Sequence, residues 1–207
     1  MNFRLPRLYP ITDTRLSGLS HAEQVHLMIA GGATLVQLRE KHASPAEFYR
    51  EAEKAIEIAH SSGVKIIIND RVDIALALKA DGVHLGQDDL PPAAARKLLG
   101  DKAIIGFSTH NMEQVKAALE LPVDYIAFGP VFATTTKENP DPVVGLELLT
   151  LIRKTLGNFP LTAIGGINET NFRDVLAAGA DSVAIISAVL SRPDLISERV
   201  KFFSANS

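Results

Sequence analysis

The sequence predicts an α/β protein whose parallel strands close into a (β/α)8 barrel. Eight short apolar, β-prone runs recur along the chain, and stretches with helical periodicity separate them. Strands that alternate with helices form parallel sheets. The 207 residues allow about 26 residues for each of eight β/α units, a compact version of the TIM barrel, which usually takes about 250.

The predicted strands are the apolar runs, each four or five residues long. In chain order they are Leu8–Thr12, Thr34–Leu38, Lys65–Ile68, Gly82–Leu85, Ala103–Phe107, Tyr125–Phe128, Leu161–Ile164 and Ser182–Ile186. The clearest helical stretches are Ala46–His60, which places Phe48, Ala52, Ile56 and Ala59 on one side, and Leu146–Leu156.

An open, doubly wound sheet is the competing α/β fold. It commonly has a Gly-x-Gly-x-x-Gly turn after its first strand, whereas the first strand here ends in Thr12-Asp13-Thr14. We therefore prefer the barrel. Since no Pro-, Ser- or Gly-rich linker divides the sequence, we predict one domain over residues 1–207. The long irregular segment Ala133–Val144 contains two prolines, and loops of this length are usually functional or mobile.

Composition excludes several classes of function. A net charge of −3 gives no global electrostatic support for binding nucleic acid or an anionic membrane. The absence of cysteine excludes disulfides, thiol nucleophiles and cysteine-ligated zinc. No apolar run approaches the ~20 residues of a membrane span, and the first ten residues do not resemble a signal peptide. We expect a cytoplasmic protein.

The stretch from Ile66 to Asp89 is predicted to be a strand–helix–strand unit that ends each strand in carboxylates. Asn69 and Asp70 follow one strand, and Asp88 and Asp89 follow the next. Neighbouring strands lie ~4.8 Å apart, so these acids can converge on one small cation such as Mg²⁺. The alternative is that the acids are helix N-caps or turn residues.

Cations follow the second strand. Alternation along the strand places Gln37, Arg39 and Lys41 on the same side, where arginine and lysine suit a diphosphate. The alternative is a solvated charge cluster in which Glu40 is their partner.

Polar residues also follow the later strands. Ser108 could bind a substrate heteroatom, Thr109 or Asn111 could cap a helix, and His110 could be an acid–base group or structural. His84, inside an apolar strand, is expected to be a satisfied core or rim residue. The sixth strand is followed by three threonines and a lysine, which can bind phosphate oxygens or form a polar surface loop. The seventh and eighth strands are followed by Gly165-Gly166 and Ile186-Ser187, at the usual phosphate site of such barrels, so phosphate binding is favoured there over an ordinary turn.

Taken together, these motifs resemble those of the thiamine phosphate synthase family. The resemblance covers nearly the whole chain and rests on eight short motifs in the expected order. They are Tyr9-Pro10-Ile11-Thr12-Asp13, Gln37-Leu38-Arg39-Glu40-Lys41, Asn69-Asp70, Gly82-Val83-His84-Leu85-Gly86-Gln87-Asp88-Asp89, Gly106-Phe107-Ser108-Thr109-His110, Gly129-Pro130-Val131-Phe132 through Thr134-Thr135-Thr136-Lys137, Gly165-Gly166-Ile167 and Ile186-Ser187.

The resemblance implies a Mg²⁺-assisted transferase. It would condense the diphosphate of 4-amino-2-methyl-5-hydroxymethylpyrimidine with 4-methyl-5-(2-phosphoethyl)thiazole, or its carboxylate form, to give thiamine phosphate and release pyrophosphate. The resemblance assigns the pyrimidine diphosphate to Gln37, Leu38, Arg39, Glu40, Lys41, Asn69, Ser108 and Lys137, Mg²⁺ to Asp70 and Asp89, and the thiazole phosphate to Thr134, Thr135, Thr136, Gly166, Ile186 and Ser187. Among these, Arg39, Lys41, Ser108 and Lys137 would be catalytic.

Two alternatives remain at this point. A thiazole tautomerase of the same superfamily would use His110 as its proton shuttle, and a non-catalytic barrel would bind thiamine precursors without needing the paired acids. The run from Thr134 to Lys137 favours the synthase. The sequence leaves the oligomeric state open, because helix faces that pack within a barrel resemble those that pack a homodimer.

Overall fold

The computed structural model of the chain describes residues 4–134, 136 and 141–206. Its strands are β1 (Leu8–Pro10), β2 (Leu35–Leu38), β3 (Lys65–Asn69), β4 (Gly82–Leu85), β5 (Ile104–Thr109), β6 (Tyr125–Phe128), β7 (Leu161–Ile164) and β8 (Ser182–Ile185). The helices are α1 (Thr14–Ser17), α2 (His21–Ala30), α3 (Pro45–Ser61), α4 (Val72–Leu78), α5 (Pro92–Leu99), α6 (Met112–Ala118), α7 (Gly145–Leu156), α8 (Phe172–Ala177), α9 (Ser187–Leu190), the 3₁₀ turn η1 (Pro193–Leu195) and α10 (Ile196–Asn206).

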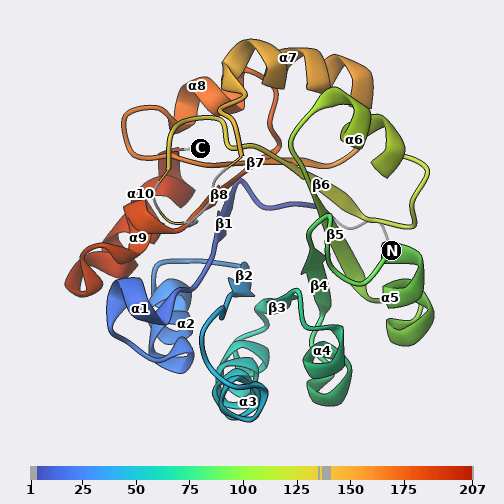
Figure 1. Cartoon of the computed structure of the whole chain (residues 1–207). Coiled ribbons are helices and arrows are strands. Elements are labelled where there is room, and N and C mark those ends of the chain that lie inside the picture. Colours follow the sequence, from blue (N-terminus) through green and yellow to red (C-terminus); the bar gives the residue numbers. More distant parts are fainter. Residues whose placement is uncertain (1–3, 135, 137–140, 207) are drawn as a thin grey trace.

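The strands form one parallel sheet that closes on itself. Its order is β1-β8-β7-β6-β5-β4-β3-β2, and a parallel bridge between Ile11 and Gln37 joins its two ends. Figure 1 looks along the barrel, with the strands at the centre and the helices in a ring around them. The predicted (β/α)8 TIM barrel is therefore confirmed.

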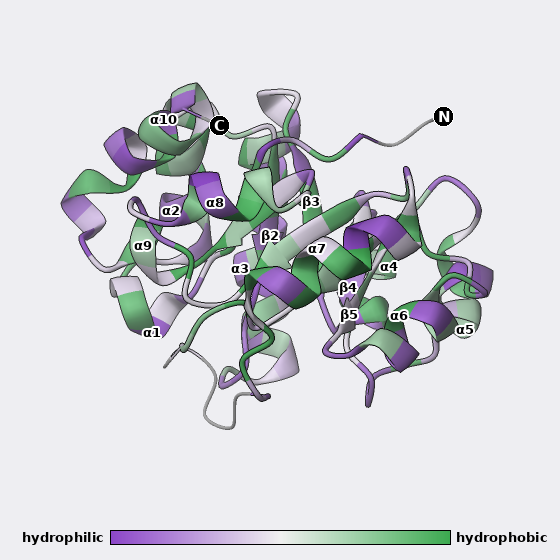
Figure 2. Ribbon diagram, turned by 90° about the horizontal axis from the view of Figure 1, so that it is seen from above, coloured by the Kyte–Doolittle hydropathy of each residue, from purple (hydrophilic) through white to green (hydrophobic). Residues whose placement is uncertain are grey.

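The sheet is buried on both faces, because every strand alternates between the helix layer and the barrel interior. The side chains that fill the interior are Leu5, Tyr9, Ile11, Leu35, Ile67, Ile104, Tyr125 and Ala184. A larger cluster packs between the strands and the helices. In Figure 2 the ribbons of the surrounding helices alternate between hydrophobic and hydrophilic colours, as expected for helices with one buried side.

The predicted strand bounds agree with the structure to within one or two residues. β1 ends at Pro10, not at Thr12, because Asp13 already serves as the N-cap of α1, where its carboxylate accepts the N–H of Leu16 at 3.0 Å. β5 extends to Thr109. Of the two predicted helix caps, Asn111 is the one that the structure shows, since its side chain accepts the N–H of Gln114 at 2.9 Å. The hydroxyl of Thr109 instead donates to the carbonyl oxygen of Ala127.

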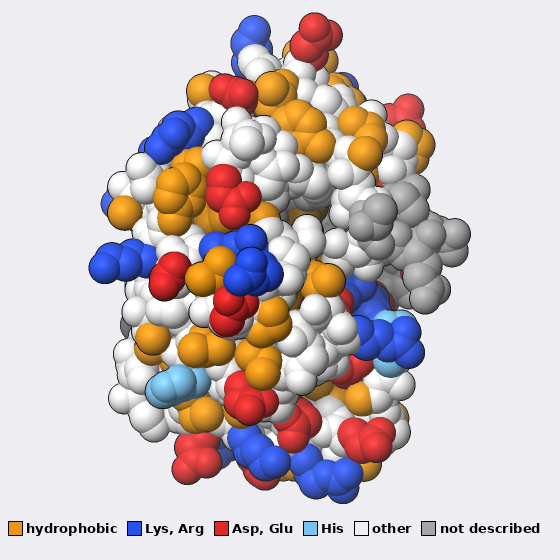
Figure 3. Space-filling view, turned by 90° about the vertical axis from the view of Figure 1, so that its left-hand side faces the viewer, with side chains coloured by type: hydrophobic (Ala, Val, Ile, Leu, Met, Phe, Trp, Pro, Cys, Tyr) orange, Lys and Arg blue, Asp and Glu red, His pale blue; other side chains and the backbone are white. Residues whose placement is uncertain are grey.

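Charges of both signs are interspersed on the face of the molecule drawn in Figure 3. Within the part of the chain that the structure describes, no helix is both long enough and apolar enough to cross a membrane.

Candidate active site

A cavity of about 600 Å³ opens at the carboxyl ends of the strands. This is the end at which (β/α)8 barrels place their active sites. Most of the residues assigned to the site from the sequence line it, although they come from seven different strand ends. They are Gln37, Arg39, Lys41, Asn69, Asp70, Asp89, Ser108, Thr134, Thr136, Gly166, Ile186 and Ser187. The predicted convergence of these residues at one mouth of the barrel is confirmed.

Four other assigned residues do not line the cavity or cannot be placed. The side chain of Leu38 is fully buried between the sheet and the helices. Glu40 lies behind the cavity wall, where its carboxylate binds the hydroxyl of Thr14 at 2.9 Å. Any substrate contact by these two would have to come from their backbones. Thr135 and Lys137 lie outside the described residues.

The two predicted metal ligands lie together. Asp70 follows the last residue of β3 and has a φ of 61°, a left-handed conformation that few residues other than glycine adopt. Its carboxylate is hydrogen-bonded to the ammonium group of Lys41. Asp89 accepts the N–H of Gly86 at 2.6 Å. Burial raises the pKa of the Asp89 carboxyl, and the adjacent Asp70 carboxylate raises that pKa further, against the lowering effect of the Gly86 N–H.

These acids are not helix caps. α4 begins after Arg71 and α5 after Pro91, in both cases without a capping side-chain bond. The N-cap alternative is therefore wrong, although the bond from Asp89 to Gly86 is a turn contact.

The donor set fits Mg²⁺. Two adjacent carboxylates repel each other, and a divalent cation would relieve that repulsion. Mg²⁺ is usually held by one or two carboxylates, with substrate phosphates and water completing its ligands. Among the described residues, no group of three or more acidic, histidine or cysteine side chains is arranged to hold a metal.

Gln37, Arg39 and Lys41 all face the cavity, as strand alternation predicted. Asp13 orients the guanidinium of Arg39, because one of its carboxylate oxygens lies 2.8 Å from Nη1. Only one of the two terminal guanidinium nitrogens makes this bond, so the fork of Arg39 keeps donors for an anion. Sequence reasoning quoted Asp13 in a motif but missed this positioning contact, which joins residues 26 positions apart.

A chain of hydrogen-bonded side chains, buried except for the half-buried Ser108, crosses the barrel at the wall of the cavity. We call Gln37, Tyr9, Tyr125, His84 and Ser108 the inner polar network. The amide of Gln37 donates to the hydroxyl of Tyr9 at 3.0 Å, and the two tyrosine hydroxyls are 2.9 Å apart. His84 binds the Tyr125 hydroxyl through Nδ1 and the Ser108 hydroxyl through Nε2, each at 2.9 Å.

The groups of this network are neutral. Burial lowers the pKa of His84 to about 4 and raises the pKa of both tyrosine hydroxyls well above their usual value. The expectation that His84 is a satisfied core or rim residue is confirmed. Sequence reasoning missed Tyr125 because one tyrosine in an apolar strand looks like an ordinary core residue.

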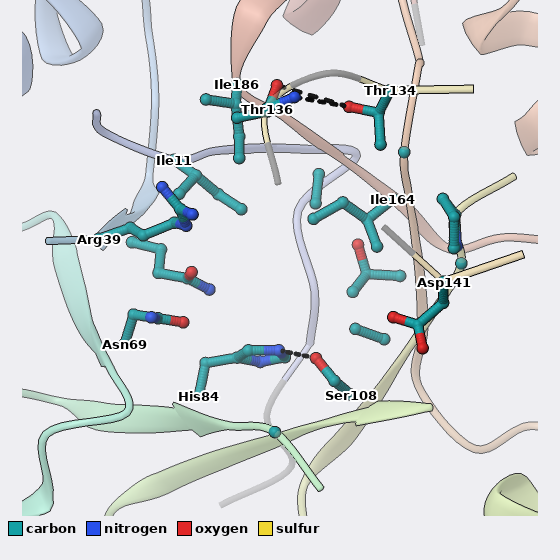
Figure 4. Close-up of a pocket in the computed structure, with 18 of the residues that line it drawn as sticks. Ile11, Arg39, Asn69, His84, Ser108, Thr134, Thr136, Asp141, Ile164 and Ile186 are labelled. Atoms are coloured by element: carbon teal, nitrogen blue, oxygen red, sulfur yellow. Dashed lines mark hydrogen bonds between the residues drawn. The ribbon is translucent and has the colours of Figure 1, made fainter. Parts of the chain in front are cut away.

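The opposite side of the cavity is built from loops and backbone. Figure 4 shows Thr134 and Thr136 beside Ile186, facing Arg39 and Asn69 across the cavity, with the His84–Ser108 bond along another wall. The glycines after β7 have φ values of 104° and 63°, so both require the left-handed region. A Cβ on Gly166 would lie 2.4 Å from the carbonyl oxygen of Ala133, so this glycine also lets the two loops pack closely.

His110 lies at the edge of the cavity. Its Nδ1 is 2.7 Å from the carbonyl oxygen of Gly129, and its Nε2 is 3.6 Å from a carboxylate oxygen of Asp141. A ring nitrogen this close to a carbonyl must carry a proton to donate, which leaves Nε2 as the nitrogen that can exchange one.

Comparison with known proteins gives a consistent result. A family model described as thiamine monophosphate synthase matches residues 8–189. The chain is 48% identical over 190 residues to the thiamine-phosphate synthase of Chloroflexus aurantiacus, covering 91% of this chain and 87% of the relative. It is 47% identical to that of Clostridium novyi, covering 91% and 93%. A solved structure of thiamine phosphate pyrophosphorylase from Pyrococcus furiosus superposes with a TM-score of 0.85 and 36% identity, over 95% of this chain and 93% of the other.

Proposed function

The chain belongs to the thiamine monophosphate synthase family, and on that premise we propose how this transferase makes thiamine phosphate. Its substrates are the diphosphate of 4-amino-2-methyl-5-hydroxymethylpyrimidine and the thiazole phosphate 4-methyl-5-(2-phosphoethyl)thiazole or its carboxylate form. Its products are thiamine phosphate and pyrophosphate. The observation that carries the proposal is that one cavity holds two sets of anion-binding groups on facing sides.

The first set receives the diphosphate. Arg39 and Lys41 supply positive charge from the end of β2, and Asn69 adds an amide beside them. Asp70 and Asp89 would hold Mg²⁺, which when bound supplies further positive charge to the diphosphate oxygens. Lys137, which lies outside the described residues, is assigned to the diphosphate by the family resemblance alone.

The second set receives the phosphate of the thiazole. Thr134 and Thr136 offer hydroxyls, and Gly166, Ile186 and Ser187 bring backbone groups of the loops after β7 and β8 to the cavity. Ser187 begins α9, in which the N–H groups of Val189 and Leu190 donate to the carbonyl oxygen of Ile186. The N–H groups of Ser187 and Ala188 would therefore be the ones to bind the phosphate.

The reaction proceeds by dissociation. The C–O bond between the pyrimidine methylene and the diphosphate breaks, and its electron pair leaves with the diphosphate. The amino-substituted ring stabilises the resulting cation, and the thiazole nitrogen then attacks with its lone pair to form the new C–N bond. Arg39 and Lys41 neutralise the departing charge, while the threonine side of the cavity holds the thiazole nitrogen in line.

The test is incubation with both substrates and Mg²⁺, with assay of pyrophosphate and thiamine phosphate. Asp70→Asn and Asp89→Asn should each abolish Mg²⁺-dependent turnover while circular dichroism shows an intact fold. Asp101→Asn is the matched control, because Asp101 is exposed and is not among the residues that line the cavity. Full wild-type activity in the presence of a chelator would contradict the metal assignment.

Lys137 is tested separately. For Lys137→Ala we expect turnover to fall by a larger factor than the KM for the thiazole phosphate rises, since a charge aimed at the departing diphosphate acts in the transition state. A change confined to KM would mean that the lysine binds only the ground state.

A further inference from the structure

We propose that the hydroxyl of Tyr125 determines which atom donates the proton in each hydrogen bond of the inner polar network, which we call the direction of the network. It thereby makes Ser108 a hydrogen-bond donor toward the pyrimidine. Tyr125 does not itself line the cavity, so it acts as a positioning residue. The part of this proposal that concerns the pyrimidine rests on the proposed function. The part that concerns the direction of the network is a property of the free protein.

The network is closed off from solvent at its centre. Tyr9 and Tyr125 are at most 1% exposed and Gln37 is 3% exposed. The ring of His84 stacks on that of Tyr125, with centroids 5.5 Å apart and an interplanar angle of 24°. A buried hydroxyl proton without an acceptor costs about 1–3 kcal/mol, so each proton in this chain needs a partner.

That requirement selects one direction. The amide of Gln37 donates to the Tyr9 oxygen, so the Tyr9 proton must point elsewhere, and the Tyr125 oxygen lies 2.9 Å away. Tyr125 therefore donates its own proton to Nδ1 of His84. In the reverse direction, Tyr9 would receive two donors, and its proton would have no acceptor among its described contacts.

The same reasoning fixes the protonation of His84. Because Nδ1 accepts, the ring is neutral and carries its proton on Nε2. That N–H donates to the Ser108 oxygen at 2.9 Å. A doubly protonated ring would donate from Nδ1 to Tyr125, and the Tyr9 proton would again have no acceptor among its described contacts. With its oxygen already accepting, Ser108 is left to donate its hydroxyl proton into the cavity, toward an atom with a lone pair such as a ring nitrogen of the pyrimidine.

Gly106 on β5 gives independent support for the position of the Tyr125 hydroxyl. A Cβ at this position would lie 2.0 Å from Cζ and 2.3 Å from the hydroxyl oxygen of Tyr125, and 2.5 Å from Nδ1 of His84. The backbone of β5 thus lies directly against the Tyr125–His84 bond. Glycine leaves the space that this bond occupies, and the bond cannot shift toward β5.

The direct test is nitrogen-15 NMR of the free, histidine-labelled protein. The resonances of His84 are those that disappear in His84→Gln, and we expect them to report a neutral ring protonated on Nε2. A ring protonated on Nδ1, or on both nitrogens, at neutral pH would overturn the proposal. This outcome does not depend on the enzymatic reaction, so it is distinct from a failure to form thiamine phosphate.

The second test is Tyr125→Phe, with Tyr49→Phe as the matched control. The Tyr49 hydroxyl lies on the outside of α3, 3.5 Å from Glu53. We expect Tyr125→Phe to raise the KM for the pyrimidine diphosphate about five- to tenfold, the value of one hydrogen bond, while the KM for the thiazole phosphate and the values for the control stay unchanged. If a folded Tyr125→Phe variant changed both KM values equally, or changed neither, the proposal would be overturned. If the variant does not fold, the NMR measurement decides.

Discussion

Asp70 shows how much of the site depends on single residues. Its φ of 61° lies in the left-handed region, which costs roughly 1 kcal/mol or more for a residue with a Cβ. Asparagine and aspartate tolerate this region better than most residues. The conformation turns the carboxylate at the end of β3 toward Lys41. In this conformation the acid lines the cavity with Asp89 and does not cap α4.

Glu40 is a second residue whose environment matters more than its position in the motif. Burial acts to raise the pKa of this carboxyl, but hydrogen bonds from the N–H groups of His42 and Ala43 and from Thr14 outweigh burial and hold the pKa at about 2. The charged form is thus favoured by folding. A depressed pKa contributes stability above the unfolded-state pKa of about 4.3, and that stability is lost as the pH falls toward 2.

We therefore predict that Glu40→Gln lowers the free energy of unfolding by about 2 kcal/mol at pH 7. The difference from the wild type should shrink as the pH falls from about 4 to about 2, where the wild-type carboxyl also becomes neutral. Urea unfolding at a series of pH values measures it. Glu57→Gln, at an exposed position of α3, is the control, and an equal loss in both variants would refute the assignment.

At the scale of elements, one hydrogen-bonding arrangement links neighbouring strands three times at the end of the barrel opposite the cavity. An aspartate precedes each of β4, β6 and β8, namely Asp81, Asp124 and Asp181, and its carboxylate accepts a backbone N–H near the start of the preceding strand. In two of the three cases an arginine also binds the aspartate. Arg96 and Arg153 each bind one of these aspartates together with several carbonyl oxygens of the adjoining turns.

Removal of one such arginine should destabilise the fold without changing the chemistry. Arg153→Ala leaves the carbonyls of Gly157, Phe159 and Gly179 without this donor, and we expect the free energy of unfolding to fall by about 3 kcal/mol. Denaturant unfolding measures the loss, with exposed Lys154→Ala as control. Turnover per folded molecule should not change, because the cavity lies at the other end.

A substitution in the loop after β7 should, in contrast, change substrate binding. Gly166→Ala places a Cβ 2.4 Å from the Ala133 carbonyl oxygen and 2.7 Å from Cβ of Phe132, so the loops after β6 and β7 must separate. We expect the KM for the thiazole phosphate to rise about tenfold or more, and by more than the KM for the pyrimidine diphosphate, because most groups proposed to bind the thiazole phosphate lie on these loops, whereas Lys137 alone is assigned from them to the diphosphate.

Gly157→Ala is the control that separates the backbone strain of a positive φ from the close contact of the added Cβ. Gly157 has a φ of 58°, close to that of Gly166, but a Cβ there meets no atom within 4 Å. This control should therefore lose only the stability that the left-handed conformation costs, with both KM values unchanged. A similar rise in KM in the two variants would show that loop packing at Gly166 is not the cause.

At the scale of the whole molecule, the site depends on closure of the barrel. The N–H of Thr12 donates to the carbonyl oxygen of Gln37 at 2.9 Å, which joins β1 to the strand that carries Arg39 and Lys41. The inner polar network likewise spans five strands. No pair of neighbouring units contains a complete set of substrate-binding groups, so the barrel must form before the site exists.

We accordingly predict that the chain unfolds as one domain. Thermal unfolding followed by circular dichroism and by calorimetry should give one transition, with calorimetric and van't Hoff enthalpies in agreement. Two separated transitions, or a van't Hoff enthalpy well below the calorimetric one, would show that part of the barrel folds independently.

The sequence by itself determined the fold and the end of the barrel at which the site lies. Strand runs such as Gly82–Leu85 and Leu161–Ile164 appear in the structure with the predicted bounds, because a strand buried on both faces is apolar throughout. Strand alternation correctly placed Gln37, Arg39 and Lys41 on one side. These properties are local, so a short stretch of sequence contains them.

Only the tertiary structure decided which groups meet. Leu38 and Glu40 belong to the same motif as Arg39, yet one packs into the core and the other binds Thr14 behind the cavity wall. Tyr9 and Tyr125 are 116 positions apart, yet their hydroxyls share a hydrogen bond. The physical reason is that closure of the barrel sets the partners of inward-facing side chains, and the spacing of residues along the chain carries no record of which strands will face each other across it.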